Sequence, residues 1–316
     1  MNNSAEQIDP NFDILMEQLG ATTEREICWK ICSVYKKLPK QLREQIAQYY
    51  TMYPFWGKLA PKKLVYETFY KRANVLKERY DDFVWLREKL ADVRSKNVLY
   101  AIMSNWFEFN FNSLVQYKET EHPEYFDPNI FPRRPDEVLV DAGAYTGDTV
   151  YVFVNTYGSY KRIYCYEITP DVFDAMKNNL SVLQNVELRQ KAVGSEPGVL
   201  YLSESSHNSA NITSTQGEIA VDVVRVDDDI SEPVSFIKMD IEGAEQAALL
   251  GCAEQIRKNH PHLAICTYHS YEDIIEIPRL IDEIAPGYKF YMRHHGGNLV
   301  PTEFTLLAVW EGIPPA

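Results

Sequence analysis

The stretch VLVDAGAYTGDT, Val138 to Thr149, combines a strand, a glycine turn and the start of a helix. Its first three residues, Val138–Val140, are an apolar run typical of a buried parallel strand. Asp141 closes this strand at its carboxyl end, where open α/β sheets bind their ligands. Gly143 and Gly147 permit a tight turn and a close approach of the backbone to a bound molecule. The stretch therefore predicts a nucleotide-type pocket.

The spacing of the glycine turn narrows the class of nucleotide. A dinucleotide-binding turn has the pattern G-x-G-x-x-G, in which the second glycine makes room for a pyrophosphate. Here Ala144, Tyr145 and Thr146 follow Gly143, so the second glycine is absent, and no G-K-[ST] of a phosphate loop follows. Thr146 or Asp148 is placed to cap the next helix. An acidic strand end beside this looser turn suits S-adenosylmethionine (SAM), a ligand without phosphate.

Two further apolar runs end in carboxylates. Arg162–Tyr166 (RIYCY) has the pattern of a second strand and is followed by Glu167. An acidic residue at this interval after a glycine turn commonly binds ribose hydroxyls. Ser235–Asp240 (SFIKMD) is another such strand, with a helical stretch at Gln246–Arg257 behind it. The acidic ends of the first two strands are expected to flank one crevice.

Together, VLVDAGAYTGDT, IYCYEITP and FIKMDIEGAE resemble the FkbM-type family of SAM-dependent methyltransferases. The resemblance runs in order from about Asp136 to Trp310, and IKMDIEGAE is its most specific part. It implies an α/β class I methyltransferase (Rossmann-like) fold with a seven-stranded sheet and an antiparallel last strand. It also implies O-methylation of a hydroxyl on a sugar, a glycan or a polyketide-like acceptor. The resemblance also places the adenine near Ala192 and Val193. The cofactor-binding residues that it implies, together with the acidic strand ends, are Asp141, Gly143, Ala144, Tyr145, Gly147, Asp148, Glu167, Ala192, Val193 and Asp240.

Methyl transfer from a sulfonium requires in-line alignment of acceptor oxygen, carbon and sulfur, and removal of a proton as the bond forms. Asp240 and Glu242 follow the fourth strand, and His269 follows the fifth. We expect His269 or Asp240 to be the general base and Glu242 to orient the acceptor hydroxyl, although His269 could instead cap the next helix or bind backbone. Lys238 alternates inward in its strand, so we expect it to pair with Glu245 or Asp240.

A divalent metal is a second interpretation of the same three catalytic candidates. Their oxygen and nitrogen atoms, or those of Asp227–Asp229, suit magnesium or manganese. No spacing compels a metal, and the acidic run is more typical of a solvated turn. Cys28 and Cys32 lie four residues apart, but no other Cys or His nearby completes a ligand set. The spacing therefore does not support a metal site, and a magnesium or manganese ion stays an open alternative.

Composition limits the class of protein. A chain of 316 residues favours two domains. The net charge of −13 argues against a nucleic-acid partner, because phosphate binding needs a basic surface. No run of eighteen apolar residues occurs and the start, MNNSAEQIDPNFD, is polar, so neither a membrane span nor a signal peptide is expected. Five cysteines suggest no disulfide framework, and a reducing cytoplasm is the expected location.

The pattern along the chain changes near residue 130. Before it, apolar residues recur at helical spacing and predict four to six helices. Glu121–Pro135 (EHPEYFDPNIFPRRP) contains four prolines and predicts a linker or docking strap. We therefore divide the chain into a helical N-terminal domain, residues 1–130, and a SAM-binding domain, residues 131–316. The aromatic residues of the first domain fit a helical core or an acceptor-binding wall, and the domain is expected to cover the acceptor or to form a homodimer.

Strand and helix patterns alternate after residue 136. Helices are expected from Thr169 to about Leu183 and from about Tyr271 to Ile284, and the polar stretch His207–Gly217 is expected to be a loop. Gly296–Asn298 separates the last two strands, and so short a connection implies an antiparallel pair. The strands expected after Glu167 are Val186–Arg189, ending near Ala192–Val193, then Gly198–Glu204, Ile219–Val226, His262–Tyr268, Tyr288–Arg293 and Glu303–Trp310.

Two other classes of function compete with a methyltransferase. A nicotinamide-dependent oxidoreductase could use the same acidic strand ends, but the missing second glycine disfavours it. A catalytically silent SAM-binding or scaffold protein would have the same pocket without the chemistry. Titration with SAM and with NAD distinguishes a methyltransferase from the oxidoreductase. An assay of methyl transfer distinguishes it from a catalytically silent SAM-binding protein.

Overall fold

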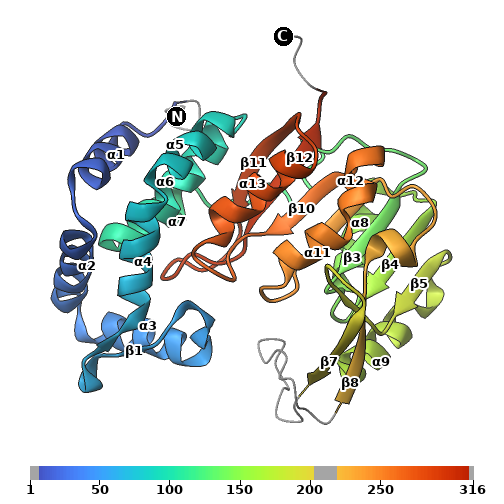
Figure 1. Ribbon diagram of the computed structural model, residues 1–316, viewed down its shortest axis with the longest axis horizontal. Helices are drawn as coiled ribbons and strands as arrows, with labels where there is room; N and C mark the ends of the chain where they lie inside the picture. Colours follow the sequence, from blue (N-terminus) through green and yellow to red (C-terminus); the bar gives the residue numbers. More distant parts are fainter. Residues whose placement is uncertain (1–6, 203–218, 313–316) are drawn as a thin grey trace. The chain divides into compact units, whose positions relative to one another are not determined.

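The computed structural model describes residues 7–202 and 219–312 (Figure 1). Contacts within the chain group it into two units. The first comprises Met1–Thr120, Thr267–Pro278 and Phe290–Leu306, and the second comprises Glu121–Cys266, Arg279–Lys289 and Leu307–Ala316. The two units are interleaved along the sequence, whereas our division at residue 130 follows chain order and stays a prediction.

Helices dominate the first unit. Seven α-helices lie within the described residues before 120, more than the four to six expected, because the first and the last of them lie outside the apolar patterns. The second helix begins with a capping box, in which Thr23 and Glu26 satisfy each other's backbone N–H groups. The helices are α1 (Asn11–Ala21), α2 (Glu24–Lys37), α3 (Lys40–Met52), α4 (Glu67–Glu78), α5 (Tyr80–Lys89), α6 (Val93–Glu108) and α7 (Phe111–Gln116), and the short strands β1 (Leu59–Ala60) and β2 (Val65–Tyr66) pair antiparallel.

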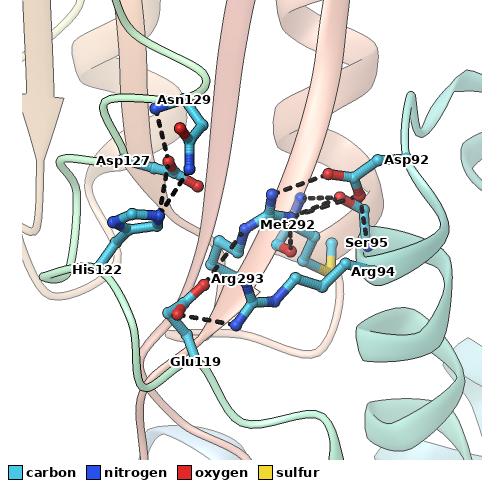
Figure 2. Close-up of polar contacts among 9 residues, drawn as sticks. All are labelled: Asp92, Arg94, Ser95, Glu119, His122, Asp127, Asn129, Met292 and Arg293. Atoms are coloured by element: carbon cyan, nitrogen blue, oxygen red, sulfur yellow. Dashed lines mark hydrogen bonds and ion pairs between the residues drawn. The ribbon is translucent and has the colours of Figure 1, made fainter. Parts of the chain in front are cut away.

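A buried ion-pair network ties Arg293 to the helical part of this unit (Figure 2). The Arg293 side chain is 6% exposed, and its Nη2 lies 2.8 Å from Oδ2 of Asp92. Glu119 joins Arg293 to Arg94, with Arg94 Nη2 2.8 Å from Glu119 Oε1 and Arg293 Nε 3.6 Å from Glu119 Oε2. Burial acts to raise the pKa of Asp92, but hydrogen bonding and charge from Arg293 outweigh it and lower that pKa. The buried charges of Arg293 and Glu119 are therefore paired, as buried charges must be.

A seven-stranded mixed sheet runs through the structure in the order β11-β12-β10-β9-β3-β4-β5. β10 pairs in parallel with β9, β9 with β3, β3 with β4, and β4 with β5. The chain moves outward from β3 in one direction through β4 and β5, and on the other side through β9 and β10, so a topological switch point lies beside β3. The strands are β3 (Val138–Ala142), β4 (Arg162–Tyr166), β5 (Val186–Arg189), β9 (Phe236–Met239), β10 (His262–Cys266), β11 (Tyr288–His294) and β12 (Phe304–Trp310).

A three-stranded sheet, in the order β6-β8-β7, lies beside these elements in the second unit. Its strands are β6 (Ala192–Val193), β7 (Gly198–Leu202) and β8 (Ile219–Val224). The expectation that one strand continues from Val186 to near Val193 was wrong, because Ala192 and Val193 pair with β8 and form a strand of their own. The loop expected at His207–Gly217 lies outside the described residues.

The helices after β3 mostly lie where expected. The single helix predicted at Gln246–Arg257 is two helices, separated at Cys252. The residue before the break, Gly251, packs so closely against the carbonyl of Gly194 that a Cβ on Gly251 would overlap it. The last helix begins at Asp273, later than expected. The helices are α8 (Asp148–Tyr157), α9 (Pro170–Asn179), α10 (Val226–Asp229), α11 (Glu245–Gly251), α12 (Ala253–Asn259) and α13 (Asp273–Ile284).

His262, the first residue of β10, is a core histidine that should make stability depend on pH. It is 2% exposed, packs against Phe131 and Phe236, and neither ring nitrogen has a hydrogen-bond partner among the described residues. Burial lowers the pKa of His262 from 6.5 to about 3. The folded pKa is below the unfolded one, so the stabilising effect of the neutral ring is complete above pH 6.5 and is lost as the pH falls toward 3.

We expect His262→Phe to flatten the loss of stability in acid. In the wild-type protein the free energy of unfolding should fall by up to about 1.4 kcal/mol per pH unit from this one group. Urea unfolding of both proteins between about pH 7 and about pH 4 measures the difference in slope. Parallel pH dependences would show that His262 does not titrate on unfolding.

The described helices lie within residues 7–202 and 219–312. None of them is both long and apolar enough to cross a bilayer.

Candidate active site

A cavity of about 420 Å³ opens at the carboxyl ends of β3, β4 and β9, in the second unit. Small-molecule and cofactor sites have volumes of about 300–1,000 Å³, so a molecule the size of a nucleoside derivative fits. The cavity is lined by seven of the residues expected to form the site, namely Gly143, Tyr145, Glu167, Ala192, Val193, Asp240 and Glu242. The other five, Asp141, Ala144, Gly147, Asp148 and His269, do not line it.

Glu167, directly after β4, presents a fixed carboxylate to the cavity. It is 9% exposed, and its Oε2 accepts a hydrogen bond from the backbone N–H of Tyr145 at 3.1 Å. Its Oε1 accepts one from the backbone N–H of Thr169 at 2.8 Å. Each carboxylate oxygen has a second lone pair, so both can accept a further hydrogen bond. The arrangement can therefore hold two neighbouring hydroxyl groups of one ligand.

The turn after β3 requires glycine at Gly143. Its φ is +77°, and a Cβ there would overlap the carbonyl oxygen of Asp240. The N–H groups of Gly143 and Ala144 donate to the carbonyl of Tyr166, at 3.0 and 2.9 Å, and hold the turn against β4. Tyr145 follows with a left-handed φ of 48°, and this residue is 54% exposed and lines the cavity. The turn thus brings the ends of three strands together.

Asp141, which was expected to bind the cofactor, does not line the cavity. It is fully buried, and its Oδ1 lies 2.9 Å from Nζ of Lys238, which also donates to the carbonyl of Gly143 at 2.8 Å. The register of β3 on β9 places the two residues side by side. Burial acts to lower the pKa of Lys238, but the charges of Asp141 and Asp240 outweigh it and raise that pKa. Lys238 therefore pairs with Asp141, and not with Glu245 or through a salt bridge to Asp240 as expected.

The start of α8 also differs from the prediction. Gly147, with φ of +85°, is the N-cap residue, and no side chain makes a capping hydrogen bond. A Cβ on Gly147 would lie 2.7 Å from the Leu180 side chain. Asp148 is the first helical residue, where its charge favours the positive end of the helix dipole. Neither Thr146 nor Asp148 caps the helix, because glycine already supplies the left-handed turn.

The wall of the cavity around β6 is apolar. Val193, Leu200 and Val223 line it, together with Ala247 of α11. Gly251 lets α11 approach β6, because a Cβ on Gly251 would overlap the carbonyl oxygen of Gly194. A flat, apolar ring is the kind of group that such a wall can bury.

The Asp227–Asp229 run supports this wall and is not the solvated turn expected. Asp229 accepts hydrogen bonds from Tyr166 at 2.7 Å and from Lys191 at 2.7 Å, and both of these residues line the cavity. The Asp227 carboxylate accepts the backbone N–H groups of Glu254 and Gln255 at the start of α12. The carboxylates of Asp227 and Asp229 thus make tertiary hydrogen bonds. A run of acidic residues in the sequence does not reveal these contacts.

A short turn after β9 carries the other acidic residues. Asp240 lies at its start and accepts a hydrogen bond from the hydroxyl of Tyr125 at 2.9 Å. Glu242 has a left-handed φ of 57° and lines the cavity. Glu245 is 1% exposed and its carboxylate accepts the backbone N–H groups of Ile241 and Gly243, at 2.8 and 3.0 Å. Glu245 therefore holds the turn that presents Asp240 and Glu242 to the cavity.

His269 belongs to the first unit, three residues after β10. It is 4% exposed, and its ring packs 4.3 Å from that of Tyr268 and 6.1 Å from that of Phe55. Trp56 Nε1 donates to the carbonyl of Tyr268 at 2.6 Å. At the start of α13, the backbone N–H of Ser270 donates to the Asp273 carboxylate, and the backbone N–H of Asp273 donates to the Ser270 hydroxyl.

Residues 141–295 match the Methyltransferase FkbM domain family. The chain carries a methyltransferase FkbM domain. The match begins within β3 and includes every expected catalytic residue. The predicted family is thereby confirmed.

A crystal structure of a methyltransferase FkbM from Methylobacillus flagellatus KT aligns with 76% of this chain and 62% of that one, at a TM-score of 0.64 and 23% identity. This chain thus spans less than two thirds of the length of that protein. The structural similarity confirms the predicted α/β methyltransferase fold. An rRNA methylase from Streptococcus thermophilus aligns with 56% of this chain and 89% of its own, at a TM-score of 0.36 and 14% identity. Fibrillarin from Aeropyrum pernix, in complex with S-adenosyl-L-methionine, aligns with 63% of this chain and 74% of its own, at a TM-score of 0.38 and 14% identity. Among curated proteins, none is a significant match.

Proposed function

We propose that this protein is a SAM-dependent O-methyltransferase that acts on a hydroxyl of a sugar, a glycan or a polyketide-like small molecule. The observation that carries the proposal is Glu167, a carboxylate fixed by two backbone N–H groups at the cavity, with an apolar wall around β6. The two oxygens of Glu167 would accept the ribose hydroxyls of SAM, and Ala192 and Val193 would contact the adenine. When bound, SAM supplies a methyl group that its positive sulfur has already activated.

The remaining steps fall to side chains of this chain. Glu242 would orient the acceptor hydroxyl, since positioning is the larger part of catalysis for an activated methyl group. Asp240 or His269 would take the hydroxyl proton, and such a base typically contributes about 10²–10⁴-fold to the rate. No part of this scheme requires a metal. A net charge of −13 supports a small-molecule or glycan acceptor in preference to a nucleic acid.

The proposed location and assembly rest on separate observations. All five cysteines are free thiols, which supports a reducing cytoplasm. For the helical first unit we keep the proposal that it covers the acceptor or forms a homodimer. Size measurement in solution and cell fractionation test these two statements.

We expect Glu167→Ala to weaken SAM binding by about 1–3 kcal/mol, because charged hydrogen bonds to the ribose are lost. Isothermal titration calorimetry measures the change. Glu196→Ala is the matched control, because Glu196 lines the same cavity but is exposed, and it should bind SAM almost as the wild type does. Tight binding of NAD with no response to SAM would instead support the oxidoreductase.

A further inference from the structure

The proline-rich strap, Glu121–Pro135, brings the hydroxyl of Tyr125 to the carboxylate of Asp240, at the carboxyl end of β9. We propose that Tyr125 is a positioning residue, which fixes the Asp240 carboxylate so that its negative charge faces the positive sulfur of the methyl donor. The inference rests on the proposed function, because it needs SAM in the cavity. It gives the strap a role in the chemistry, beyond linking two parts of the chain.

The contacts of Tyr125 reach two strand ends at once. Its hydroxyl donates to Oδ2 of Asp240 at 2.9 Å and lies 3.7 Å from Sγ of Cys266, the last residue of β10. Nζ of Lys238 lies 5.1 Å from the centre of the tyrosine ring. The side chain is 8% exposed, so its hydrogen bond to a carboxylate forms away from bulk water, where such a bond is strong.

The strap itself is anchored on both sides of Tyr125. Phe126 is fully buried, with its ring 5.3 Å from that of Phe153 and 5.6 Å from that of Phe236. After it the chain turns at Asp127, whose Oδ1 accepts the backbone N–H of Asn129 at 2.9 Å and lies 3.5 Å from His122 (Figure 2). These contacts hold the strap backbone, so the tyrosine hydroxyl has a defined position.

The backbone at Tyr125 is in an unfavourable conformation. Its φ is +70°, in the left-handed region that a bulky residue rarely adopts. Such a conformation persists only where the surroundings determine it, and it is concentrated at functional sites. The packing of Phe126 explains how the strap is held, but it does not require a hydroxyl at position 125. The hydrogen bond to Asp240 is what the hydroxyl adds.

The expected effect follows from the charge of the ligand. SAM has a positive sulfur, whereas its product S-adenosylhomocysteine (SAH) has a neutral one. A carboxylate held toward the sulfur therefore strengthens SAM binding but leaves SAH binding nearly unchanged. A tyrosine that served only the fold would affect both ligands equally.

The test compares Tyr125→Phe with the wild type by calorimetry, using SAM and SAH as the two probes. Tyr160→Phe is the matched control, because its hydroxyl also makes one hydrogen bond, to the carbonyl of Gln184, at the surface. We expect Tyr125→Phe to reduce the ratio of SAM to SAH affinity by about 3–10-fold. Asp240→Asn should reduce the same ratio at least as much, and Tyr160→Phe should leave it unchanged.

Each result decides one question. A reduced ratio in Tyr125→Phe with unchanged SAH affinity supports the positioning role. An unchanged ratio, or an equal loss for both ligands, overturns it, and urea unfolding then shows whether the loss reflects stability. If the wild-type protein binds neither SAM nor SAH, it is the proposed function that fails. If Asp240→Asn lowers the ratio and Tyr125→Phe does not, only the role of Tyr125 is rejected.

Discussion

Replacing Lys238 by methionine is expected to lower the free energy of unfolding by about 3–5 kcal/mol. The change removes the cation 2.9 Å from Asp141 and leaves a fully buried carboxylate without it. The loss is large because a carboxylate without a partner must be desolvated or protonated in the folded state. Urea unfolding near neutral pH measures the effect.

Two further variants separate the charge from the shape of the side chain. Asp141→Leu combined with Lys238→Met should recover much of the lost stability, because well-packed apolar groups can replace a buried ion pair. Lys71→Met is the surface control, since Lys71 pairs with Glu67 at an exposed position and should cost less than about 1 kcal/mol. Equal stability of Lys238→Met and the wild type would contradict a structural role for the pair.

The second large effect is expected at His269. If it is the base, His269→Ala should lower kcat by about 10²-fold or more, while SAM affinity stays within a few fold, because the side chain matters mainly in the transition state. Transfer of labelled methyl from SAM to a panel of sugars, glycans and polyketide-like alcohols measures the rate. His260→Ala is the control, because His260 precedes β10 and its ring stacks on Trp310, whereas His269 follows the carboxyl end of β10.

Asp240→Asn and a chelator complete this experiment. Asp240→Asn should lower both turnover and SAM affinity, because its carboxylate lines the cavity. EDTA should leave the rate unchanged. Loss of activity with EDTA and its return with magnesium or manganese would reassign Asp240 as a metal ligand. An unchanged rate in His269→Ala would remove His269 from the mechanism.

Consecutive residues carry enough information to predict most elements of the second unit. Apolar runs mark β3, β4 and β9, since burial of a strand depends on its own residues. The left-handed φ of Gly143 and Gly147 likewise reflects local backbone sterics. The ends of helices and strands are predicted less exactly than the elements themselves, and the break between two helices at Cys252 shows why. It coincides with a contact between Gly251 and a strand distant in sequence.

The amino-acid sequence is enough to predict the family, the sheet with acidic strand ends, and a pocket that includes Glu167 and Asp240. These follow from local patterns and from the spacing of a few motifs. Contacts between distant segments determine which carboxylates stabilise the fold and which line the cavity. The register of β3 on β9 pairs Asp141 with Lys238, and the strap brings Tyr125 to Asp240. Such partners are set by strand order and packing between distant segments, which no periodicity in the chain encodes.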